Sequence, residues 1–280
     1  MARFRVCIVN GGSRKIPDIV AALSGLGCNC AVIPLPDANA HAVNDYAAAV
    51  LSGGPGLFSS KDDGPRLRAQ FDFIARLAVP TLGICLGHQA IGIRFGAAIR
   101  KAELAHRLEP IRLLRPHPLI DGIADGTPFH EEHSENISLP PGFLHIATSD
   151  SCQIEAMACD ERRLYGVQFH PEVSGEPGAR LFANFLRLAR HTARAANQES
   201  GSMKKQDCPA FAAILLLLRL GFMALLPCSI TVFSLACQIG KTQAPGACPP
   251  TSIALAIVAG FCLAPFGLFG LFILLRGLKQ

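Results

Sequence analysis

Short apolar runs and longer amphipathic stretches alternate along the first 95 residues. The apolar runs have the length of buried strands and cover 4–9, 31–35, 47–51 and 81–84. The stretches between them have the spacing of helices and cover 17–27, 66–77 and 87–95. Pro17 and Gly27 are the residue types that commonly begin and end a helix. This alternation predicts the α/β class, with a mostly parallel central sheet and helices on both faces.

The pattern changes in the middle of the chain. Strand-like segments, separated by turn residues, cover 107–114, 143–148, 152–158 and 163–169. A last helix is expected at about 178–195. This order predicts a run of β-structure before the last helix of a domain that spans 1–196.

The chain beyond residue 196 has a different composition. Residues 197–209 are polar and are expected to form a linker. Between 210 and 275 the only charged side chains are Arg219 and Lys241. Two apolar runs there are each long enough to cross ~30 Å of hydrocarbon as a helix, at about 211–236 and 252–275. We therefore predict that 210–280 form two transmembrane helices, a hairpin in a membrane.

Basic residues set the expected orientation of this hairpin. Lys204 and Lys205 precede the first apolar run, and Arg276 and Lys279 follow the second, whereas the connection contains only Lys241. Positively charged flanks stay on the cytoplasmic side. The predicted location is therefore a multi-pass membrane protein with two spans, with the first domain and both termini in the cytoplasm. A helical domain buried in water is disfavoured, because so few polar side chains could not cover it.

Composition and charge exclude several classes of function. With 50% hydrophobic and 17% charged residues, the chain is neither disordered nor a coiled coil. Six of the 26 basic and one of the 21 acidic residues lie beyond residue 200, so the first 200 residues hold 20 of each. The net charge of +5 therefore gives the folded domain no basic face, and no nucleic-acid partner is expected.

Cysteine and histidine spacings show no disulfide framework or metal motif. The 11 cysteines include no C-x-x-C pair, and the N-terminus lacks the plan of a signal peptide. We therefore expect reduced thiols in the cytosol. His130 and His133 lack the spacing of the H-E-x-x-H zinc motif, since only two residues separate them. Neither a metal nor a cofactor is predicted.

The Gly-Ile-Cys-Leu-Gly sequence at 83–87 places a cysteine between a predicted strand and a predicted helix. Small residues two positions before and after a nucleophile permit the sharp turn that lifts its side chain out of a sheet. The N–H groups at the start of the helix then point at the same spot and favour negative charge there. Cys85 is therefore a candidate nucleophile. The alternative is a buried cysteine that only packs.

Two further segments supply what a thiol nucleophile needs. Gln-Phe-His-Pro-Glu at 168–172 offers a base, His170, and a carboxylate, Glu172, that an extended chain places on one side. The Ser-Gly-Gly-Pro-Gly loop at 52–56 follows a strand and can offer a backbone N–H to an oxyanion. It lacks the G-K-[ST] of a phosphate-binding loop. An ordinary tight turn is the alternative for this loop.

In this order, the three segments resemble the class I, triad-type glutamine amidotransferases over about residues 4–190. Within the family the chain is most similar to the glutaminase subunit of GMP synthase, in the segments at 52–55, 152–157 and 165–174. The resemblance implies a flavodoxin-like fold. Where the family has a Ser-His-x-Asp segment near the synthetase interface, this chain has Glu-His-Ser-Glu at 132–135.

The resemblance implies a role for each triad residue. Cys85 would attack the side-chain amide of glutamine and form a γ-glutamyl thioester. His170 would take the thiol proton and hand one to the departing ammonia, and Glu172 would orient His170. The triad would thus make the chain a glutaminase.

The resemblance also assigns the oxyanion hole to the N–H groups of Gly54 and Leu86, and a part in substrate binding to Gln89. The chain has no Ser-Gly-Gly-x-Asp-Ser loop for ATP, so it would supply ammonia to a separate ATP-dependent synthetase chain of the GMP synthetase type. Two alternatives stay open. One is a stand-alone hydrolase of γ-glutamyl compounds, and the other is a membrane-tethered binding or regulatory module with a dormant site.

Overall fold

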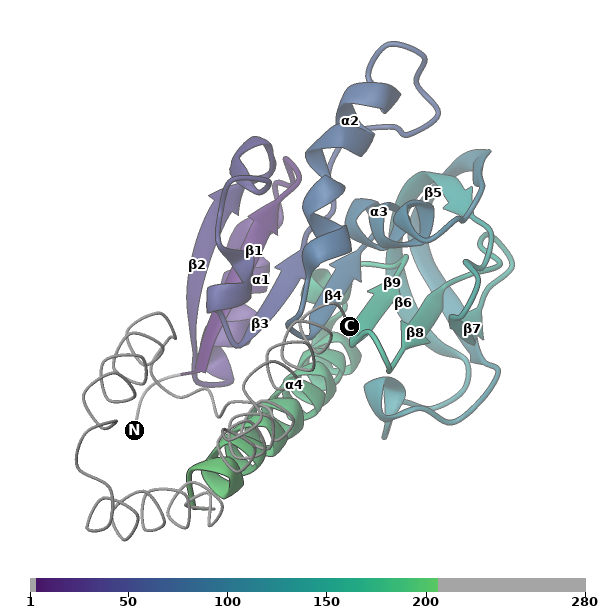
Figure 1. Ribbon diagram of the computed structural model, residues 1–280. Helices are drawn as coiled ribbons and strands as arrows, with labels where there is room; N and C mark the ends of the chain where they lie inside the picture. Colours follow the sequence, from purple (N-terminus) through teal and green to yellow (C-terminus); the bar gives the residue numbers. More distant parts are fainter. Residues whose placement is uncertain (1–3, 206–280) are drawn as a thin grey trace, which may run out of the picture. The chain divides into compact units, whose positions relative to one another are not determined.

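The computed structural model describes residues 4–205 of the chain (Figure 1). The chain divides into two compact units, Met1–Gln198 and Glu199–Gln280. The predicted membrane runs at 211–236 and 252–275 lie outside the described residues. Within the described part, no helix combines the length and the apolar character that a bilayer crossing requires.

Nine strands in the described part of the chain form one sheet, in the order β2-β1-β3-β4-β9-β8-β7-β5-β6. The first five strands of this order are parallel to one another. They are β2 (Cys28–Pro34), β1 (Phe4–Asn10), β3 (Ala48–Leu51), β4 (Thr81–Ile84) and β9 (Leu164–Val167). This parallel half matches the pattern predicted for the first 95 residues.

The remaining four strands pair antiparallel and extend the sheet beyond β9. They are β8 (Ala156–Cys159), β7 (Leu144–Thr148), β5 (Ile99–Leu113) and β6 (Thr127–Ile137). The sheet is therefore mixed, and "mostly parallel" describes only one half of it. The connections from β7 to β8 and from β8 to β9 are too short for the crossover that a parallel pair needs.

Helices cover both faces of the parallel half, as predicted (Figure 1). Their bounds are α1 (Ile16–Gly25), α2 (Gly64–Gln70), α3 (Leu86–Arg94) and α4 (Gly175–Lys205). α1 and α4 pack in the core that contains Val6 and Ile8, and α2 and α3 pack in the core that contains Cys7 and Val9. Alternate side chains of β1 thus point into two separate cores.

Short 3-10 helices complete the described elements. They are η1 (Leu35–Asp37), η2 (Val43–Asp45), η3 (Asp72–Arg76), η4 (Pro118–Ile120) and η5 (Pro171–Val173). The helix predicted at 66–77 is divided between α2 and η3. Phe71 and Ile74 are both buried there, and the three-residue period of a 3-10 helix places them on one side.

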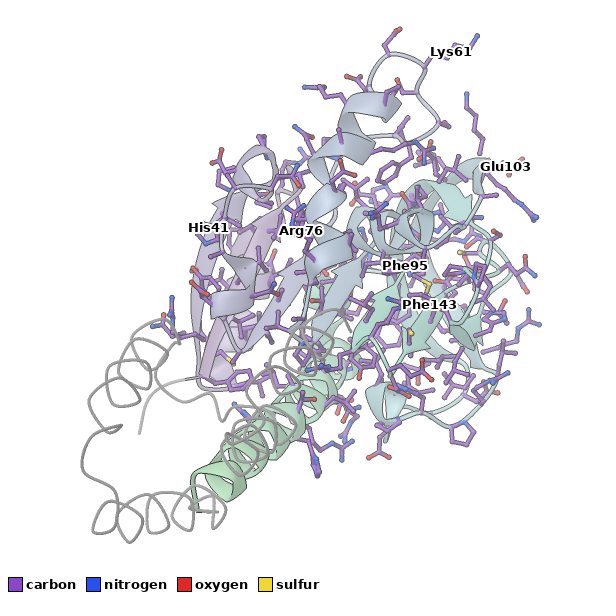
Figure 2. All side chains as sticks on the ribbon, in the orientation of Figure 1. His41, Lys61, Arg76, Phe95, Glu103 and Phe143 are labelled. Atoms are coloured by element: carbon purple, nitrogen blue, oxygen red, sulfur yellow. The ribbon has the colours of Figure 1, made fainter. Side chains whose placement is uncertain are left out.

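Two other predicted elements differ in extent. β5 begins at Ile99 rather than at residue 107, and α4 continues to Lys205, into the segment expected to be a linker. Aromatic packing joins the two halves of the sheet: Phe95 after α3 lies beside Phe143 before β7 (Figure 2), with ring centroids 5.7 Å apart.

The sequence pattern did not predict β6. Its side chains alternate between exposed or half-buried and buried, as in any half-covered strand, but three of the buried ones are Glu131, His133 and Glu135. A hydrophobic alternation is therefore missing. Two of these three residues, His133 and Glu135, line the cavity described next.

Candidate active site

The Cys85 elbow predicted from the sequence is present. Cys85 lies between β4 and α3 with φ 48° and ψ −104°, a conformation that non-glycine residues rarely adopt. A Cβ on Gly83 would overlap the carbonyl of Gly87, and a Cβ on Gly87 would overlap the carbonyl of Leu51. Both glycines are therefore required by the close approach of the backbone, and the turn presents the thiol at the carboxyl end of the parallel strands.

His170 and Glu172 follow β9 and form a buried pair. His170 Nδ1 lies 2.8 Å from Glu172 Oε1, and both side chains are at most 5% exposed. His170 Nε2 is also buried and has no hydrogen bond within the described residues, so it is the nitrogen left for the thiol. A Cβ placed on Gly53 would lie 3.0 Å from His170 Cε1 and 3.5 Å from Cys85 Cβ. The imidazole and the thiol thus converge beside one glycine.

The surroundings of His170 favour its protonated form. Burial alone lowers the pKa of an imidazole, but interactions with Cys85 and Glu172 outweigh it and raise the pKa of His170 from 6.5 to about 10. The imidazolium that forms when His170 takes a proton is therefore stabilised by its neighbours.

Gly54 and Leu86, the predicted oxyanion-hole residues, lie side by side. A Cβ on Gly54 would overlap the carbonyl of Gly11 and would approach Leu86 Cδ2 to 2.9 Å. Leu86 is the first residue of α3, where an N–H has no partner within the helix. Ser52 supports this loop, since its Oγ accepts a 2.9 Å bond from Gly11 N and donates a 2.8 Å bond to Gly53 O.

Gln89 lies one turn into α3 and is 3% exposed. Its Nε2 donates to Glu135 O at 2.9 Å and to Gln168 Oε1 at 3.2 Å. These bonds fix the side-chain amide between α3, β6 and the segment that leads to His170. Gln89 is thus held rigidly at the cavity wall.

A cavity of about 370 Å³ opens over the thiol. Four of the six predicted site residues line it: Gly54, Cys85, Gln89 and His170. Leu86 and Glu172 stand behind them. The cavity also contains an ion pair that the sequence did not indicate, between Lys15 and Glu132. These two residues are 117 positions apart, so no local pattern could have paired them.

Glu135 is a further residue that sequence reasoning missed. Its buried carboxylate accepts bonds from Phe58 N at 2.9 Å and from Ser59 N at 2.8 Å. It thereby ties β6 to the segment that follows the glycine loop. The Glu-His-Ser-Glu sequence at 132–135 was noted only as a counterpart of a family motif, and its contacts become visible only in the fold.

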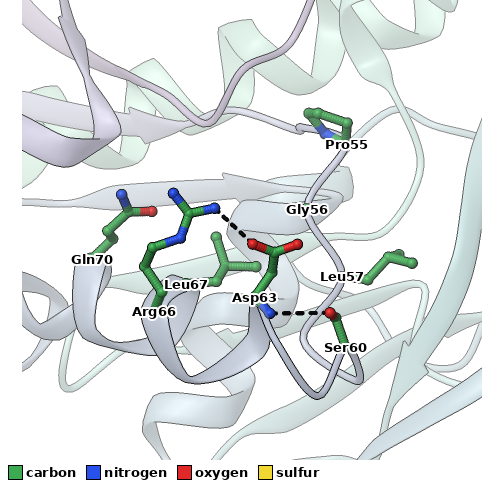
Figure 3. Close-up of a pocket in the computed structure, with 8 residues that line it drawn as sticks. All are labelled: Pro55, Gly56, Leu57, Ser60, Asp63, Arg66, Leu67 and Gln70. Atoms are coloured by element: carbon green, nitrogen blue, oxygen red, sulfur yellow. Dashed lines mark hydrogen bonds and ion pairs between the residues drawn. The ribbon is translucent and has the colours of Figure 1, made fainter.

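A neighbouring cavity of about 330 Å³ shares Pro55, Gly56 and Leu57 with the one over the thiol (Figure 3). Its far wall belongs to α2 and the turn before it. There Asp63 accepts a 2.8 Å bond from Arg66, and Ser60 Oγ accepts a bond from Asp63 N at 3.1 Å (Figure 3). The loop at 55–57 therefore separates two hollows, and of these two only one is lined by Cys85 and His170.

Three buried groups lie close together at one side of the cavity: His133, which lines it, and Glu131 and Glu155, which do not. Their ligand-type atoms all lie within 4.8 Å of one another. Burial raises the pKa of Glu131 from 4.5 to about 8 and that of Glu155 well above 4.5. The sequence predicted no metal site because no local motif joins these residues, whereas the fold brings two distant segments together.

Comparison with known proteins agrees with this geometry. Residues 9–189 match the class-I glutamine amidotransferase family. The chain belongs to this family, and its enzyme class is that of a glutamine amidotransferase, as the sequence predicted. The family region contains the Cys85 elbow and the His170–Glu172 pair, but not the residues beyond α4.

Among curated relatives, the chain is similar to two archaeal proteins that are each named as one subunit of a glutamine-hydrolyzing GMP synthase. It is 32% identical over 196 residues to the protein of Methanosarcina barkeri, which covers 67% of this chain and 98% of the relative. It is 31% identical over 189 residues to the protein of Sulfolobus acidocaldarius, which covers 66% of this chain and 99% of the relative. The matched region is thus almost the whole of each relative.

Solved structures show the same fold. A protein from Thermoplasma acidophilum, described as one subunit of GMP synthase, superposes with a TM-score of 0.64 and 25% identity, covering 70% of this chain and 99% of that one. A glutamine amidotransferase from Thermotoga maritima superposes with a TM-score of 0.53 and 19% identity, covering 70% and 86%. The second comparison bears on the fold alone.

Proposed function

We propose that this chain is the glutaminase subunit of a GMP synthase-type amidotransferase. The observation that carries the proposal is the convergence of Cys85, His170 and Glu172 beneath a glycine loop at one cavity. The archaeal relatives, matched over nearly their whole length, support the GMP synthase type.

The proposed reaction begins with the thiol. Cys85 Sγ attacks the δ-carbonyl carbon of glutamine while its proton passes to His170 Nε2. The C–N bond of the resulting tetrahedral intermediate breaks, and His170 returns the proton to the leaving nitrogen, which departs as ammonia. Water then attacks the γ-glutamyl thioester, releases glutamate and restores the thiol.

Each supporting group has a place in these steps. Glu172 holds His170 by Nδ1, so that Nε2 faces the thiol, and stabilises the imidazolium. The N–H groups of Gly54 and Leu86 bind the oxyanion, a contribution worth about 10²–10³ in kcat per donor in comparable sites. Gln89 borders the cavity and contributes to substrate binding. The raised pKa of His170 favours the imidazolium that forms when it takes the thiol proton.

The ammonia needs an acceptor enzyme. Ammonia is protonated in bulk water, so efficient transfer requires a docked synthetase chain and a sheltered route. We propose that a separate ATP-dependent synthetase of the GMP synthetase type is this partner. The relatives are themselves named as one subunit of a GMP synthase, which supports a second chain.

The test measures glutamate release from glutamine by the full-length protein, with and without ATP, xanthosine monophosphate and a GMP synthetase chain. We expect turnover that rises with the synthetase, is abolished in Cys85→Ala and is unchanged in Cys30→Ala, a matched cysteine on β2. Turnover that requires Cys85 but ignores the synthetase would instead favour a stand-alone γ-glutamyl hydrolase. Absence of turnover, with no reaction of Cys85 toward a glutamine-like electrophile, would favour a dormant binding module.

We further propose that 210–280 anchor the enzyme as a two-helix membrane hairpin, with the catalytic domain and both termini in the cytoplasm. The support is the pair of apolar runs and the basic residues at their outer ends. The connection between the runs contains Cys248. A membrane-impermeant maleimide applied to intact cells should label Cys248 and leave Cys30 unlabelled, as mass spectrometry of the peptides would show. Recovery of the protein in the soluble fraction would contradict the anchor.

A further inference from the structure

The inward face of β6 contributes to a buried polar cluster that the catalytic steps above do not use. Glu131 and His133 come from β6, and Glu155 comes from the segment just before β8. The two glutamates are 0% exposed and His133 is 5% exposed. The cluster thus joins the far edge of the antiparallel half of the sheet to its interior.

The one ion-pair contact of these groups within the described residues lies inside the cluster itself, 3.2 Å from His133 Nε2 to Glu131 Oε2. Both carboxylate oxygens of Glu131, both ring nitrogens of His133 and Oε2 of Glu155 are buried without a hydrogen bond within the described residues. Ser149 Oγ donates to Glu155 Oε1 at 2.5 Å. No Lys or Arg in the part of the chain that the structure describes pairs with either glutamate.

Glu109, a nearby glutamate, differs from Glu131 and Glu155 because both of its carboxylate oxygens have hydrogen-bond partners. Glu109 is also buried, but its Oε2 accepts from Arg107 Nε at 2.8 Å and its Oε1 accepts from Ser151 N at 2.9 Å. Desolvating two carboxylates without such partners costs several kcal/mol. The pair at Glu131 and Glu155 therefore requires a compensating positive charge or a shared proton.

We propose that Glu131, His133 and Glu155 form a binding site for a divalent transition-metal ion. Two carboxylates neutralise a doubly charged ion, and an imidazole with two carboxylates is a donor set that Zn²⁺ accepts. Ligands of a tetrahedral zinc ion lie about 3.3–3.5 Å apart. The 3.2 Å between His133 Nε2 and Glu131 Oε2 is close to this spacing, and an oxygen of Glu155 lies within 4.8 Å of both atoms.

The position of the proposed site suits a structural ion that holds β6 against the segment before His170. Gln168 N donates to Glu155 O at 2.8 Å, and His170 N donates to His130 O at 2.8 Å. The segment that leads to the catalytic histidine is thus bonded on both sides to chain that carries the metal ligands. An ion at the cluster would fix β6 against this segment and hold the cavity wall at His133 in place.

The experiment measures metal content and binding in the full-length protein. The protein is purified without chelator, analysed for metals by mass spectrometry, stripped, and titrated with Zn²⁺. The ligand variants Glu131→Gln and Glu155→Gln keep the side-chain shape and remove one charge each. Glu103→Gln is the matched control, because Glu103 is an exposed residue of β5 (Figure 2). Cys85→Ala controls for zinc bound by the catalytic thiol.

We expect one equivalent of Zn²⁺ per chain in the wild type, Glu103→Gln and Cys85→Ala. The zinc-loaded Cys85→Ala protein should show nitrogen and oxygen ligands and no sulfur by X-ray absorption. Each ligand variant should lose at least about 10–100-fold in affinity. Addition of Zn²⁺ to stripped wild type should raise the unfolding midpoint by about 4 °C or more.

Three results would overturn the site. One is a wild-type chain that neither contains nor binds Zn²⁺, which would leave the two carboxyls sharing a proton. Another is sulfur coordination in the Cys85→Ala protein, which would place the ion on other cysteines. The third is unchanged affinity in a folded Glu131→Gln or Glu155→Gln protein. If both glutamate variants fail to fold, the Zn²⁺ titration of the wild type and the X-ray absorption spectrum of the Cys85→Ala protein still test the proposed site.

Discussion

The parallel and antiparallel halves of the sheet contribute different things to one cavity. The parallel half has apolar strands, and its candidate reactive side chains follow the ends of two of them. Cys85 follows β4, and His170 follows β9. The antiparallel half contributes β6, a strand whose buried face is itself polar. In the proposed mechanism the first half therefore supplies the reacting groups, and the second supplies part of the cavity wall beside them.

This difference has a physical origin. Parallel strands are covered by helices on both faces, so polar side chains are tolerated only where the strands end. In β6 the inward side chains can be polar because His133 lines the cavity and Glu135 accepts bonds from the backbone at 58–59. If the two halves have these separate roles, substitutions in the parallel half should change kcat or the free energy of unfolding. Substitutions in the antiparallel half should mainly change KM.

The largest effect is expected for His170→Asn. Loss of the base that accepts and returns the proton should lower kcat for glutamate release by about 10²–10⁴-fold, and the variant should also be less stable, because the buried Glu172 carboxylate loses its ion-pair partner. Steady-state glutamate assays measure it. His130→Asn is the control, because the described contact of His130 with the site is through its backbone. Equal losses in the two variants would mean that His170 acts only as a packing residue.

Gly87→Ala should cause the next largest change. The added Cβ would overlap the Leu51 carbonyl in the middle of the sheet, so the free energy of unfolding should fall by about 3 kcal/mol or more. Denaturant unfolding gives the value. Gly25→Ala at the end of α1, where nothing lies within 4 Å of the new Cβ, should stay within about 1 kcal/mol of wild type. A well-folded Gly87→Ala protein would show that the elbow is less tightly constrained than its contacts indicate.

Glu172→Gln should change the pH dependence of stability. The folded-state pKa of His170 is raised from 6.5 to about 10, so its contribution to stability is complete below pH 6.5 and is lost as the pH rises through about 10. Without the carboxylate this loss should begin at least about one pH unit lower. The stability difference between wild type and variant should therefore shrink as the pH rises. Unfolding curves from pH 6 to 10.5 test this, and a constant difference would contradict it.

Glu135→Ala tests the antiparallel half. Its carboxylate holds two backbone N–H groups of the segment at 58–59, and each orphaned group costs about 1–3 kcal/mol. The loosened cavity wall should raise KM by about 10-fold, while kcat falls less. Glu103→Ala on the exposed side of β5 should leave both constants unchanged. If only kcat falls and KM is unchanged, Glu135 acts on the chemical step and not on substrate binding.

Lys15→Met should have the smallest effect. The Lys15–Glu132 pair lies at the cavity, but the two side chains are 25% and 41% exposed. Solvent screens such pairs, so kcat/KM should change by less than about 5-fold. Lys61→Met, an exposed residue of the loop before α2 (Figure 2), is the control. A much larger loss in Lys15→Met would assign the lysine to substrate recognition.

The sequence by itself determined the parts of this protein that local patterns encode. The strand at 81–84, the cysteine turn and the helix after it are contiguous, and their glycines are spaced as the turn requires. His170 and Glu172 are only two residues apart, so their pairing was also predictable, although Glu172 lies in the 3-10 helix η5 and not on the extended chain that the sequence predicted. The predicted order of strands and helices in the first 95 residues matches the parallel half for the same reason.

Only the tertiary structure decided what depends on contacts between distant polar residues. The hydrophobic pattern did not predict β6, because Glu131, His133 and Glu135 occupy its buried face. The bonds from Glu135 to the loop at 58–59, and the approach of Glu155 to Glu131, join segments with no local signature. The hydrophobic pattern of a sequence identifies the apolar residues that pack in a core, but it does not show which polar residues the fold buries together.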